Sequence, residues 1–360
     1  MKKGTFITES ILEWFDMNRR ELPWRDVRTP YGTWISETML QQTRVTTVIP
    51  YYRRFLNLFP DISTLALAPQ DEVYKAWEGL GYYSRARNLQ KGAKFCLENF
   101  SGSLPGSYDD LLKVPGIGPY TAGAIASLAF GLPEPAVDGN VIRVFSRLYA
   151  LFIFPQDARS KIEVFALVRE LLPPERAGDF NEAIMDLGAT VCLPGNPSCH
   201  ICPLSGYCEA YISGKQGELP LRRQKKQSPV VSYTIVIIKK GDSIFIRQRA
   251  DSGLLANLFE FPSYPGFLSP DDLQDQLSRD LCLNREEITS ITPLGGAAHV
   301  FSHLKWEMEG FLVELADNRK ASLPLIISEK QDRGDFYTIS EAKKMAFASA
   351  IKAYTSYVIK

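Results

Sequence analysis

The spacing of apolar residues changes near residue 212. Before this point, apolar side chains recur at intervals of three and four, for example at 11–15 and 125–129, and this interval is typical of amphipathic helices. Turn signals that contain proline or glycine separate these stretches. Residues 1–212 therefore predict an all-α domain.

From residue 231 onward the interval between apolar residues is two, which is the period of a half-buried β-strand. Two such runs, 231–238 and 244–249, flank the turn sequence Lys-Lys-Gly-Asp and predict a hairpin. A third run covers 306–315. We therefore expect a smaller α+β domain over 231–360.

Two further segments complete the organisation of the chain. Residues 342–354 are rich in helix formers, with Thr338 or Ser340 as the cap, and predict a helix near the end. Residues 213–230 carry prolines, glycines and a basic run, and so predict an exposed linker between the domains. The basic run is equally consistent with a strap on a phosphate backbone and with a solvated hinge.

Length and charge set limits on the function. A chain of 360 residues predicts two domains more readily than one. Its 41 basic and 41 acidic residues cancel, so net charge gives no indication of the partner. No apolar run reaches the roughly 18 residues of a membrane span, and the N-terminus lacks the apolar core of a secretory signal. We expect a cytoplasmic protein without membrane association.

Four of the six cysteines are closely spaced, at Cys192, Cys199, Cys202 and Cys208. Disulfide networks suit short secreted chains, so we expect reduced thiols that bind metal. Four-cysteine zinc sites usually have two Cys-x2-Cys pairs, whereas this run has one. The unequal gaps favour an iron–sulfur cluster over zinc.

A glycine-rich turn lies between two helical stretches within 108–131. Gly116 and Gly118 permit an unusual turn that can present backbone amides to a phosphate. Further along, Asp138 can cap a helix over 141–148. The turn sequence Val-Pro-Gly-Ile-Gly-Pro-Tyr-Thr-Ala, the later Asp-Gly-Asn-Val and the downstream cysteines together resemble the helix-hairpin-helix DNA glycosylase superfamily. In that superfamily the matching aspartate is catalytic.

The N-terminal stretches narrow this resemblance to the adenine DNA glycosylase (MutY) family. They are Leu-Pro-Trp-Arg at 22–25 and Trp-Ile-Ser-Glu-Thr-Met-Leu-Gln-Gln-Thr-Arg-Val at 34–45, and the resemblance covers essentially the whole chain. The related endonuclease III family shares the hairpin, the aspartate and the cysteines but lacks the helix with Glu37 and the second domain. Alone, Glu37 is consistent with a surface glutamate, but its apolar neighbours favour a perturbed pKa.

The resemblance implies a monofunctional glycosylase that flips adenine, paired with 8-oxoguanine or guanine, out of duplex DNA. Glu37 would protonate adenine at N7 and later activate water, and Asp138 would stabilise or capture the oxocarbenium ion in a retaining course. Tyr120 and Asn140 would support Asp138. Tyr120 also stands where strand-cutting relatives carry a Schiff-base lysine.

The resemblance assigns further residues to DNA. Gln42 and Tyr82 match residues that wedge into the base stack, and Arg25 and Glu182 match residues that contact the flipped adenine. It also implies a 4Fe-4S cluster on the four cysteines and a monomeric protein. Candidate phosphate contacts, which a solvated helix face explains equally well, are Arg85, Arg87 and Lys91.

The second domain resembles the Nudix hydrolases through residues 254–262. Residues 271–287 lack the clustered glutamates that hold magnesium in those enzymes, so we expect no hydrolysis. The resemblance assigns the reading of 8-oxoguanine to Phe301, by intercalation, and to Ser302 and His303, by hydrogen bonds. An ordinary strand end with a surface histidine is the alternative.

Three other functions stay open at this point. The first is another glycosylase of the superfamily, specific for mismatched thymine or oxidised pyrimidines, against which Glu37 and residues 301–303 argue. The second is an iron–sulfur electron carrier or redox sensor. The third is a DNA-binding module without catalysis. Release of a base by the protein would exclude the last two.

Overall fold

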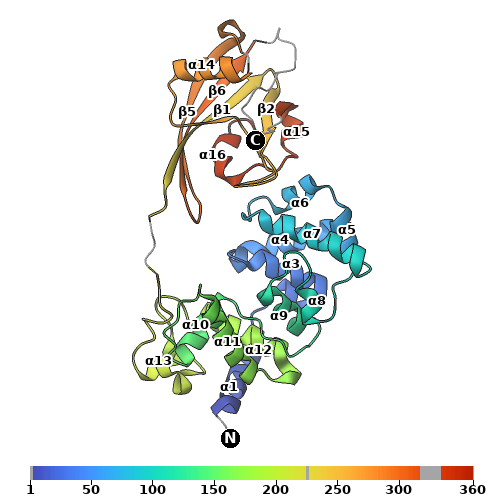
Figure 1. Cartoon of the computed structure of the whole chain (residues 1–360), viewed down its shortest axis with the longest axis vertical. Helices are drawn as coiled ribbons and strands as arrows, with labels where there is room; N and C mark the ends of the chain where they lie inside the picture. Colours follow the sequence, from blue (N-terminus) through green and yellow to red (C-terminus); the bar gives the residue numbers. More distant parts are fainter. Residues whose placement is uncertain (1–2, 224–226, 282, 317–333, 360) are drawn as a thin grey trace. The chain divides into compact units, whose positions relative to one another are not determined.

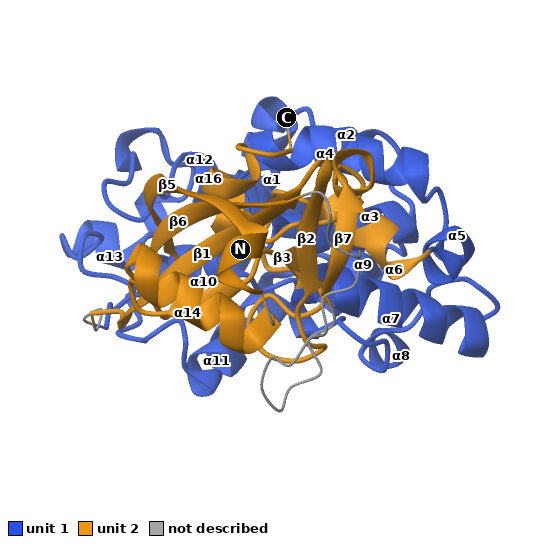
Figure 2. Ribbon diagram, turned by 90° about the horizontal axis from the view of Figure 1, so that it is seen from above, with its two compact units in different colours: residues 1–68, 84–225 blue, residues 69–83, 226–360 orange. Residues whose placement is uncertain are grey.

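The computed structural model describes residues 3–223, 227–281, 283–316 and 334–359 (Figure 1). Their contacts divide the chain into two compact units (Figure 2). The helical unit comprises residues 1–68 and 84–225, and the C-terminal unit comprises residues 69–83 and 226–360. Nothing in the sequence pattern had indicated that the short segment 69–83 groups with the second unit.

The helical unit is built from helices joined by short turns, as expected from its apolar spacing. Apolar residues of α1, α10, α11 and α12, including the fully buried Phe145 and Phe180, form one core. Each such buried aromatic stabilises the fold by about 1.5–3 kcal/mol. The helices are α1 (Lys3–Asn18), α2 (Pro23–Asp26), α3 (Pro30–Leu40), α4 (Val45–Leu58), α5 (Ile62–Leu67), α7 (Ser84–Asn99), α8 (Tyr108–Leu111), α9 (Pro119–Leu128), α10 (Gly139–Leu148), α11 (Ala158–Leu171), α12 (Ala177–Thr190) and α13 (Glu209–Ile212).

The C-terminal unit is built around one mixed sheet, which has seven strands among the described residues. Strands β3, β2, β1, β6 and β5 follow one another in that order, while β4 pairs with β1 and β7 with β2. Strands β1 and β6 are parallel, and the other pairs are antiparallel. The elements are α6 (Gln70–Trp77), β1 (Val230–Lys240), β2 (Ser243–Gln248), β3 (Phe259–Glu260), β4 (Ser263–Pro265), α14 (Pro270–Leu281), β5 (Ile288–Val300), β6 (Lys305–Leu315), β7 (Gly334–Thr338), α15 (Ile339–Ala342) and α16 (Lys352–Thr355).

Two of the strand predictions are confirmed. Strands β1 and β2 form the expected antiparallel hairpin, with Lys239 opposite Ile244. Strand β6 coincides with the third alternating run. Buried and less buried positions largely alternate in β6, as period-two spacing predicts, whereas β1 and β2 each bury a continuous run of residues and so have both faces covered.

The predicted helix over 342–354 is wrong as one continuous helix, since only its last part is helical, in a 3-10 turn over Ser349–Ile351 and in α16. Thr338 does cap a helix, in a capping box with Glu341, but α15 ends at Ala342. The chain then becomes extended, because Ala346 O accepts from Phe259 N at 3.0 Å and Ala348 N donates to Phe259 O at 3.2 Å. Pairing with β3 therefore overrides the local helix propensity.

Residues 213–223 of the predicted linker pack within the helical unit, whereas residues 227–230 belong to the C-terminal unit, where β1 begins at Val230. Leu219 is buried, and Leu221 N donates to Ile153 O at 3.0 Å. Arg222 donates to Pro194 O, and Arg223 pairs with Asp157 at 2.7 Å. These two arginines therefore have partners within the protein, and residues 224–226 of the basic run lie outside the described residues.

Within the described ranges, no helix combines the length and the apolar character needed to cross a bilayer.

Candidate active site

Helix α3 carries Glu37 into the interior of the helical unit. Thr29 caps the helix by accepting from Gly32 N at 3.0 Å, and every residue from 32 to 39 is buried. Glu37 itself is 5% exposed. Burial raises the pKa of its carboxyl to about 7, against the opposing effect of a hydrogen bond from Tyr120. The carboxyl is therefore poised to hold or release a proton near neutral pH.

Tyr120, at the start of α9, is the direct partner of Glu37. Its hydroxyl donates to Glu37 Oε2 and lies 3.6 Å from Met185 Sδ. Burial, together with the nearby carboxylates, raises the pKa of Tyr120 well above its ordinary value, so the phenol remains a donor. The sequence interpretation paired Tyr120 with Asp138, and in the structure its hydrogen bond goes to Glu37 instead.

Asp138 forms the N-cap of α10, as its position before the helix predicted. Its Oδ1 accepts from Val141 N at 2.8 Å, and its Oδ2 accepts from Asn140 Nδ2 at 2.7 Å. Burial raises the pKa of Asp138, and these two hydrogen bonds oppose that rise. Because a cap hydrogen bond uses only part of the carboxylate's acceptor capacity, capping and chemistry are compatible.

Asn140 joins Asp138 to the cysteine region through Arg143. Asn140 Oδ1 accepts from Arg143 Nη2 at 2.8 Å, and Arg143 Nε donates to Cys192 O at 2.8 Å. A continuous chain of hydrogen bonds therefore connects the capping aspartate to the backbone of the first cysteine.

Arg25 and Glu182 belong to a buried ion-pair network. Arg25 Nε lies 3.0 Å from Glu182 Oε1, and its two Nη atoms lie 2.8 and 3.0 Å from the oxygens of Asp186. Arg28 Nη2 lies 2.6 Å from Glu182 Oε2, and Arg20 Nε donates to Asp186 Oδ1 at 2.9 Å. The sequence reasoning missed Asp186 and Arg28, although Glu182 and Asp186 are four residues apart on α12 and so share one face of it.

The two hairpin glycines, Gly116 and Gly118, differ in whether the backbone geometry requires glycine at their positions. Gly116 has φ +87°, and a Cβ there would meet Asn88 Cβ at 2.9 Å, so the turn needs glycine. Gly118 has an ordinary extended φ of −96° and precedes α9. Nothing lies within 4 Å of a Cβ placed at Gly118. Only Gly116 is therefore required for backbone geometry, and a phosphate contact for either glycine stays a prediction.

Arg85 is a structural residue and not the phosphate contact considered from the sequence. It is buried, and its Nη1 donates to the carbonyls of Thr38 and Met39 at 2.9 Å and of Gln41 at 2.5 Å. These carbonyls end α3 and have no partners within the helix, so a buried cation satisfies them. Gln42 follows directly, exposed and with φ +58°.

The other two basic candidates, Arg87 and Lys91, are half-buried and exposed respectively. Their proposed phosphate contacts stay predictions.

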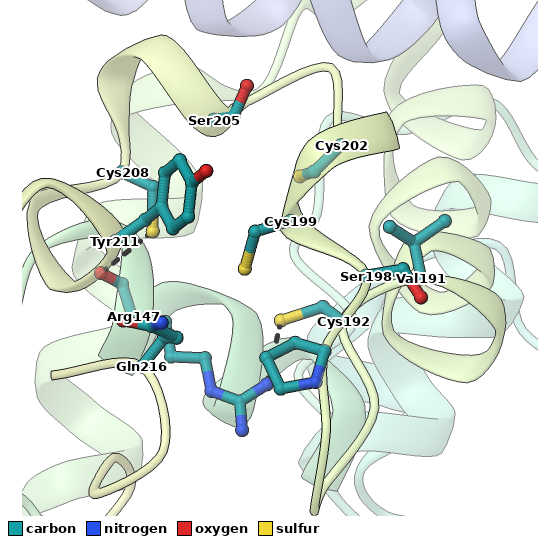
Figure 3. Close-up of a pocket in the computed structure, with 11 residues that line it drawn as sticks. Arg147, Val191, Cys192, Ser198, Cys199, Cys202, Ser205, Cys208, Tyr211 and Gln216 are labelled. Atoms are coloured by element: carbon teal, nitrogen blue, oxygen red, sulfur yellow. Dashed lines mark hydrogen bonds between the residues drawn. The ribbon is translucent and has the colours of Figure 1, made fainter. Parts of the chain in front are cut away.

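The four cysteines line one pocket (Figure 3). Within the described ranges, no three His, Cys, Asp or Glu side chains converge closely enough to hold a single metal ion. Four thiols that line one pocket without converging on a single point fit a multi-atom cluster better than one zinc ion, whose sulfur ligands must lie about 2.3 Å from the metal. The residues present therefore fit an iron–sulfur cluster.

Arg147 lies beside this pocket and ties it to its surroundings. Its Nη1 donates to Cys192 Sγ at 3.2 Å, and its Nε donates to Leu219 O at 2.9 Å. Its own carbonyl accepts from Cys208 Sγ at 3.3 Å. A buried guanidinium therefore places a positive charge and a hydrogen-bond donor directly beside the cysteine pocket.

The remaining candidates lie in the C-terminal unit. Phe301, Ser302 and His303 form the turn between β5 and β6, closed by Phe301 N donating to Leu304 O at 2.8 Å. Phe301 packs edge-on against Trp306 at 5.1 Å, while Ser302 and His303 are exposed. Tyr82, in the segment 69–83, is 47% exposed.

Comparisons with known families agree with this arrangement. Residues 35–174 match the HhH-GPD superfamily of base excision DNA repair proteins, residues 192–208 match the iron-sulfur binding domain of endonuclease III, and residues 233–357 match the NUDIX domain. The structure of a thermostable thymine-DNA glycosylase is similar with a TM-score of 0.55 and 29% identity, over 59% of this chain and 97% of that one. Endonuclease III in a trapped covalent intermediate with DNA gives 0.51 and 26%, over 59% and 99%. The fold and the cysteine site thus define a DNA N-glycosylase with an iron–sulfur cluster.

Curated relatives narrow this class. The adenine DNA glycosylase of Buchnera aphidicola subsp. Baizongia pistaciae is 39% identical over 82% of each chain. The adenine DNA glycosylase of Mus musculus is 34% identical over 89% of this chain and 73% of its own. The chain therefore belongs to the adenine DNA glycosylase family.

Proposed function

We propose that this chain, as a monomer in the cytoplasm, removes adenine paired with 8-oxoguanine or guanine from duplex DNA. The observation that carries the proposal is the state of Glu37, a buried carboxyl with a pKa of about 7 beside the phenol of Tyr120. Adenine leaves its sugar readily only after a ring nitrogen is protonated. A carboxyl that is half protonated at neutral pH is the group that can supply this proton.

The second carboxyl takes the complementary role. As the C–N bond breaks, positive charge develops on the sugar, and an ionised Asp138 stabilises or captures it. The hydrogen bonds from Val141 N and Asn140 favour the ionised form against the effect of burial. Glu37, now deprotonated, accepts the proton of the incoming water, which completes a retaining course.

The hairpin supports a glycosylase without strand cleavage. Tyr120 is the residue beside Glu37, and a phenol cannot form a Schiff base with the sugar. Lys113 is exposed and pairs with Asp110 at 2.6 Å, away from the buried carboxyl. A strand break should therefore appear only after alkali.

Recognition of the damaged pair involves both units in this proposal. Gln42 and Tyr82 wedge into the stack, Arg25 and Glu182 contact the flipped adenine, and the exposed turn at 301–303 reads the opposite base. The four cysteines would all serve as ligands of a 4Fe-4S cluster, which leaves none of them to act on the substrate. The cluster when bound supplies structural support to residues 192–208.

The test is incubation with a duplex that holds adenine opposite 8-oxoguanine, followed by alkali. We expect strand breaks after alkali and none before it, and none with an adenine–thymine duplex. Glu37→Gln should bind the duplex as wild type does and lose at least about 100-fold in adenine release. The exposed Glu13→Gln is the matched control. Adenine release by Glu37→Gln at the wild-type rate would refute the assignment.

The opposite-base reading needs a separate test. Because residues 69–83 pack within the C-terminal unit, deletion of the C-terminal residues would also disturb this segment. Point changes at the exposed turn avoid this problem. Ser302→Ala combined with His303→Ala should narrow the rate ratio between 8-oxoguanine and guanine pairs, and an unchanged ratio would remove the turn from the proposal.

A further inference from the structure

The loop at 79–82 presents Tyr82 in an uncommon backbone conformation. Gly79, Gly81 and Tyr82 have φ angles of 100°, 70° and 48°. A non-glycine residue adopts positive φ only when its surroundings hold it there. Trp77 supplies part of this support, since its Nε1 donates to Gly81 O at 3.2 Å.

Both ends of the loop are also anchored to one residue distant in sequence, Phe347. The N–H of Phe347 donates to Glu78 Oε1 at 3.3 Å, and Glu78 directly precedes the loop. The carbonyl of Phe347 accepts from the Tyr83 hydroxyl at 3.5 Å, and Tyr83 directly follows the loop. Lys75 reinforces the first anchor, since its Nζ lies 2.6 Å from Glu78 Oε2 and 2.9 Å from Met345 O.

Phe347 is in turn part of the sheet. Its neighbours Ala346 and Ala348 exchange hydrogen bonds with Phe259 of β3, in a parallel bridge. In an extended segment, successive residues direct their backbone groups to opposite sides. This alternation leaves the backbone of Phe347 to bind Glu78 and Tyr83. The ring of Phe347 packs against Phe261 at 5.5 Å and is buried, so the anchor is fixed.

We propose that Glu78 and Tyr83 are positioning residues through which the sheet of the C-terminal unit holds Tyr82 ready to enter the base stack. Figure 2 colours α6 with this sheet, in agreement with its contacts. The inference rests on the proposed function, in which Tyr82 acts as a wedge. A preorganised loop loses little conformational entropy on binding, so more of the binding free energy is available to unstack the base. The C-terminal unit then has two tasks, reading the opposite base and fixing the wedge.

The test compares Glu78→Ala with Glu78→Gln in the full chain. Glutamine keeps an oxygen that accepts from Phe347 N, whereas alanine removes the anchor. Glu72→Ala is the matched control, because Glu72 is an exposed glutamate on α6, the helix that ends directly before Glu78. The probe is a duplex with a cleavage-resistant 2′-fluorinated adenosine opposite 8-oxoguanine and 2-aminopurine beside it, whose fluorescence rises when the stack opens.

We expect Glu78→Ala to lower the fluorescence gain and the single-turnover rate on the cleavable duplex by about tenfold. The affinity of Glu78→Ala for the duplex should stay within about twofold of wild type, and its melting temperature within a few degrees. Glu78→Gln should recover most of the lost fluorescence gain and rate. In a Tyr82→Ala background, Glu78→Ala should add nothing, because both changes act through the same side chain.

Three results would overturn the inference. The first is that Glu78→Ala gives the same fluorescence gain and rate as Glu72→Ala. The second is that Glu78→Ala lowers the rate but leaves the fluorescence gain unchanged. The third is that the effects of Glu78→Ala and Tyr82→Ala on the rate are fully additive. A wild-type protein that releases no adenine would refute the proposed function instead. The fluorescence comparison, which needs no cleavage, would still decide the role of Glu78.

Discussion

Replacement of Glu37 by glutamine should stabilise the protein in neutral and basic solution. The ordinary pKa of a glutamate is 4.5, and burial raises that of Glu37 to about 7. At about 1.4 kcal/mol per pKa unit, the folded state therefore binds this proton more tightly than the unfolded chain by about 3 kcal/mol. Glu37 is 5% exposed, so solvent screening does not reduce this figure substantially.

The sign follows from the raised pKa. Below about pH 4.5 the carboxyl is protonated in both states and costs nothing. As the pH rises toward 7, the unfolded chain ionises first, and stability is lost until the folded carboxyl also ionises. Glutamine has the same shape, can accept the Tyr120 hydrogen bond and does not titrate. The stability of Glu37→Gln relative to wild type should therefore grow with pH, to about 2 kcal/mol at pH 6 and about 3 kcal/mol at pH 8.5.

The measurement is urea denaturation of both proteins at pH 6, 7 and 8.5. Tryptophan fluorescence, to which Trp14, Trp24 and Trp34 of the helical unit contribute, and the iron–sulfur absorbance are followed in parallel. The exposed Glu13→Gln should show no pH-dependent difference from wild type. A Glu37→Gln protein that is less stable than wild type at every pH, or whose advantage does not change with pH, would refute the reasoning.

Three further predictions follow from the hydrogen-bond partners in the site. In wild type the hydrogen bond from Tyr120 lowers the pKa of Glu37, so Tyr120→Phe should raise that pKa. The basic limb of the pH–rate profile should then move to higher pH. If Tyr120 supported Asp138 instead, the acidic limb would move. Asn140→Ala should raise the pKa of Asp138 and move the acidic limb of the pH–rate profile to higher pH. Single-turnover rates measured between pH 4.5 and 7 would show this shift. An acidic limb at the wild-type pH would contradict the prediction. Arg85→Ala should lower the free energy of unfolding by about 2–4 kcal/mol, because three carbonyls at the end of α3 lose a charged donor, and the exposed Lys91→Ala should leave it unchanged. Arg85→Ala unfolding at the wild-type urea concentration would contradict this last assignment.

The sequence predicted best where one local rule sufficed. Helical spacing, period-two strands and the cap at Asp138 each depend on residues close together in the chain, and all three are present in the structure. The helix predicted over 342–354 is interrupted because Phe259, far away in sequence, pairs with Ala346 and Ala348, and only residues from Ser349 onward are helical again. No local pattern carries that information.

Within the site, residue types were easier to predict than their partners. Glu37 stood out by its apolar neighbours, and its burial and raised pKa agree. The partner of Tyr120 and the role of Arg85 could not be predicted, because each depends on how separate helices pack. From the sequence, arginines spaced along a polar helix are consistent with phosphate binding. The structure shows that one of them, Arg85, instead donates to a carbonyl at the end of α3.

The buried Glu37 carboxyl on α3 lowers the stability of the protein when it is ionised. An ionised Glu37 costs about 3 kcal/mol, a large part of the net stability of a typical domain. Thr29 at the start of the helix and Arg85 at its end offset this cost, since each satisfies backbone groups that the helix leaves unpaired. Neither residue needs to touch the substrate for its loss to reduce activity, because a helix freed at either end no longer holds Glu37 beside Tyr120. Loss of activity on mutation of Arg85 is therefore no sign of a phosphate contact unless stability is measured as well.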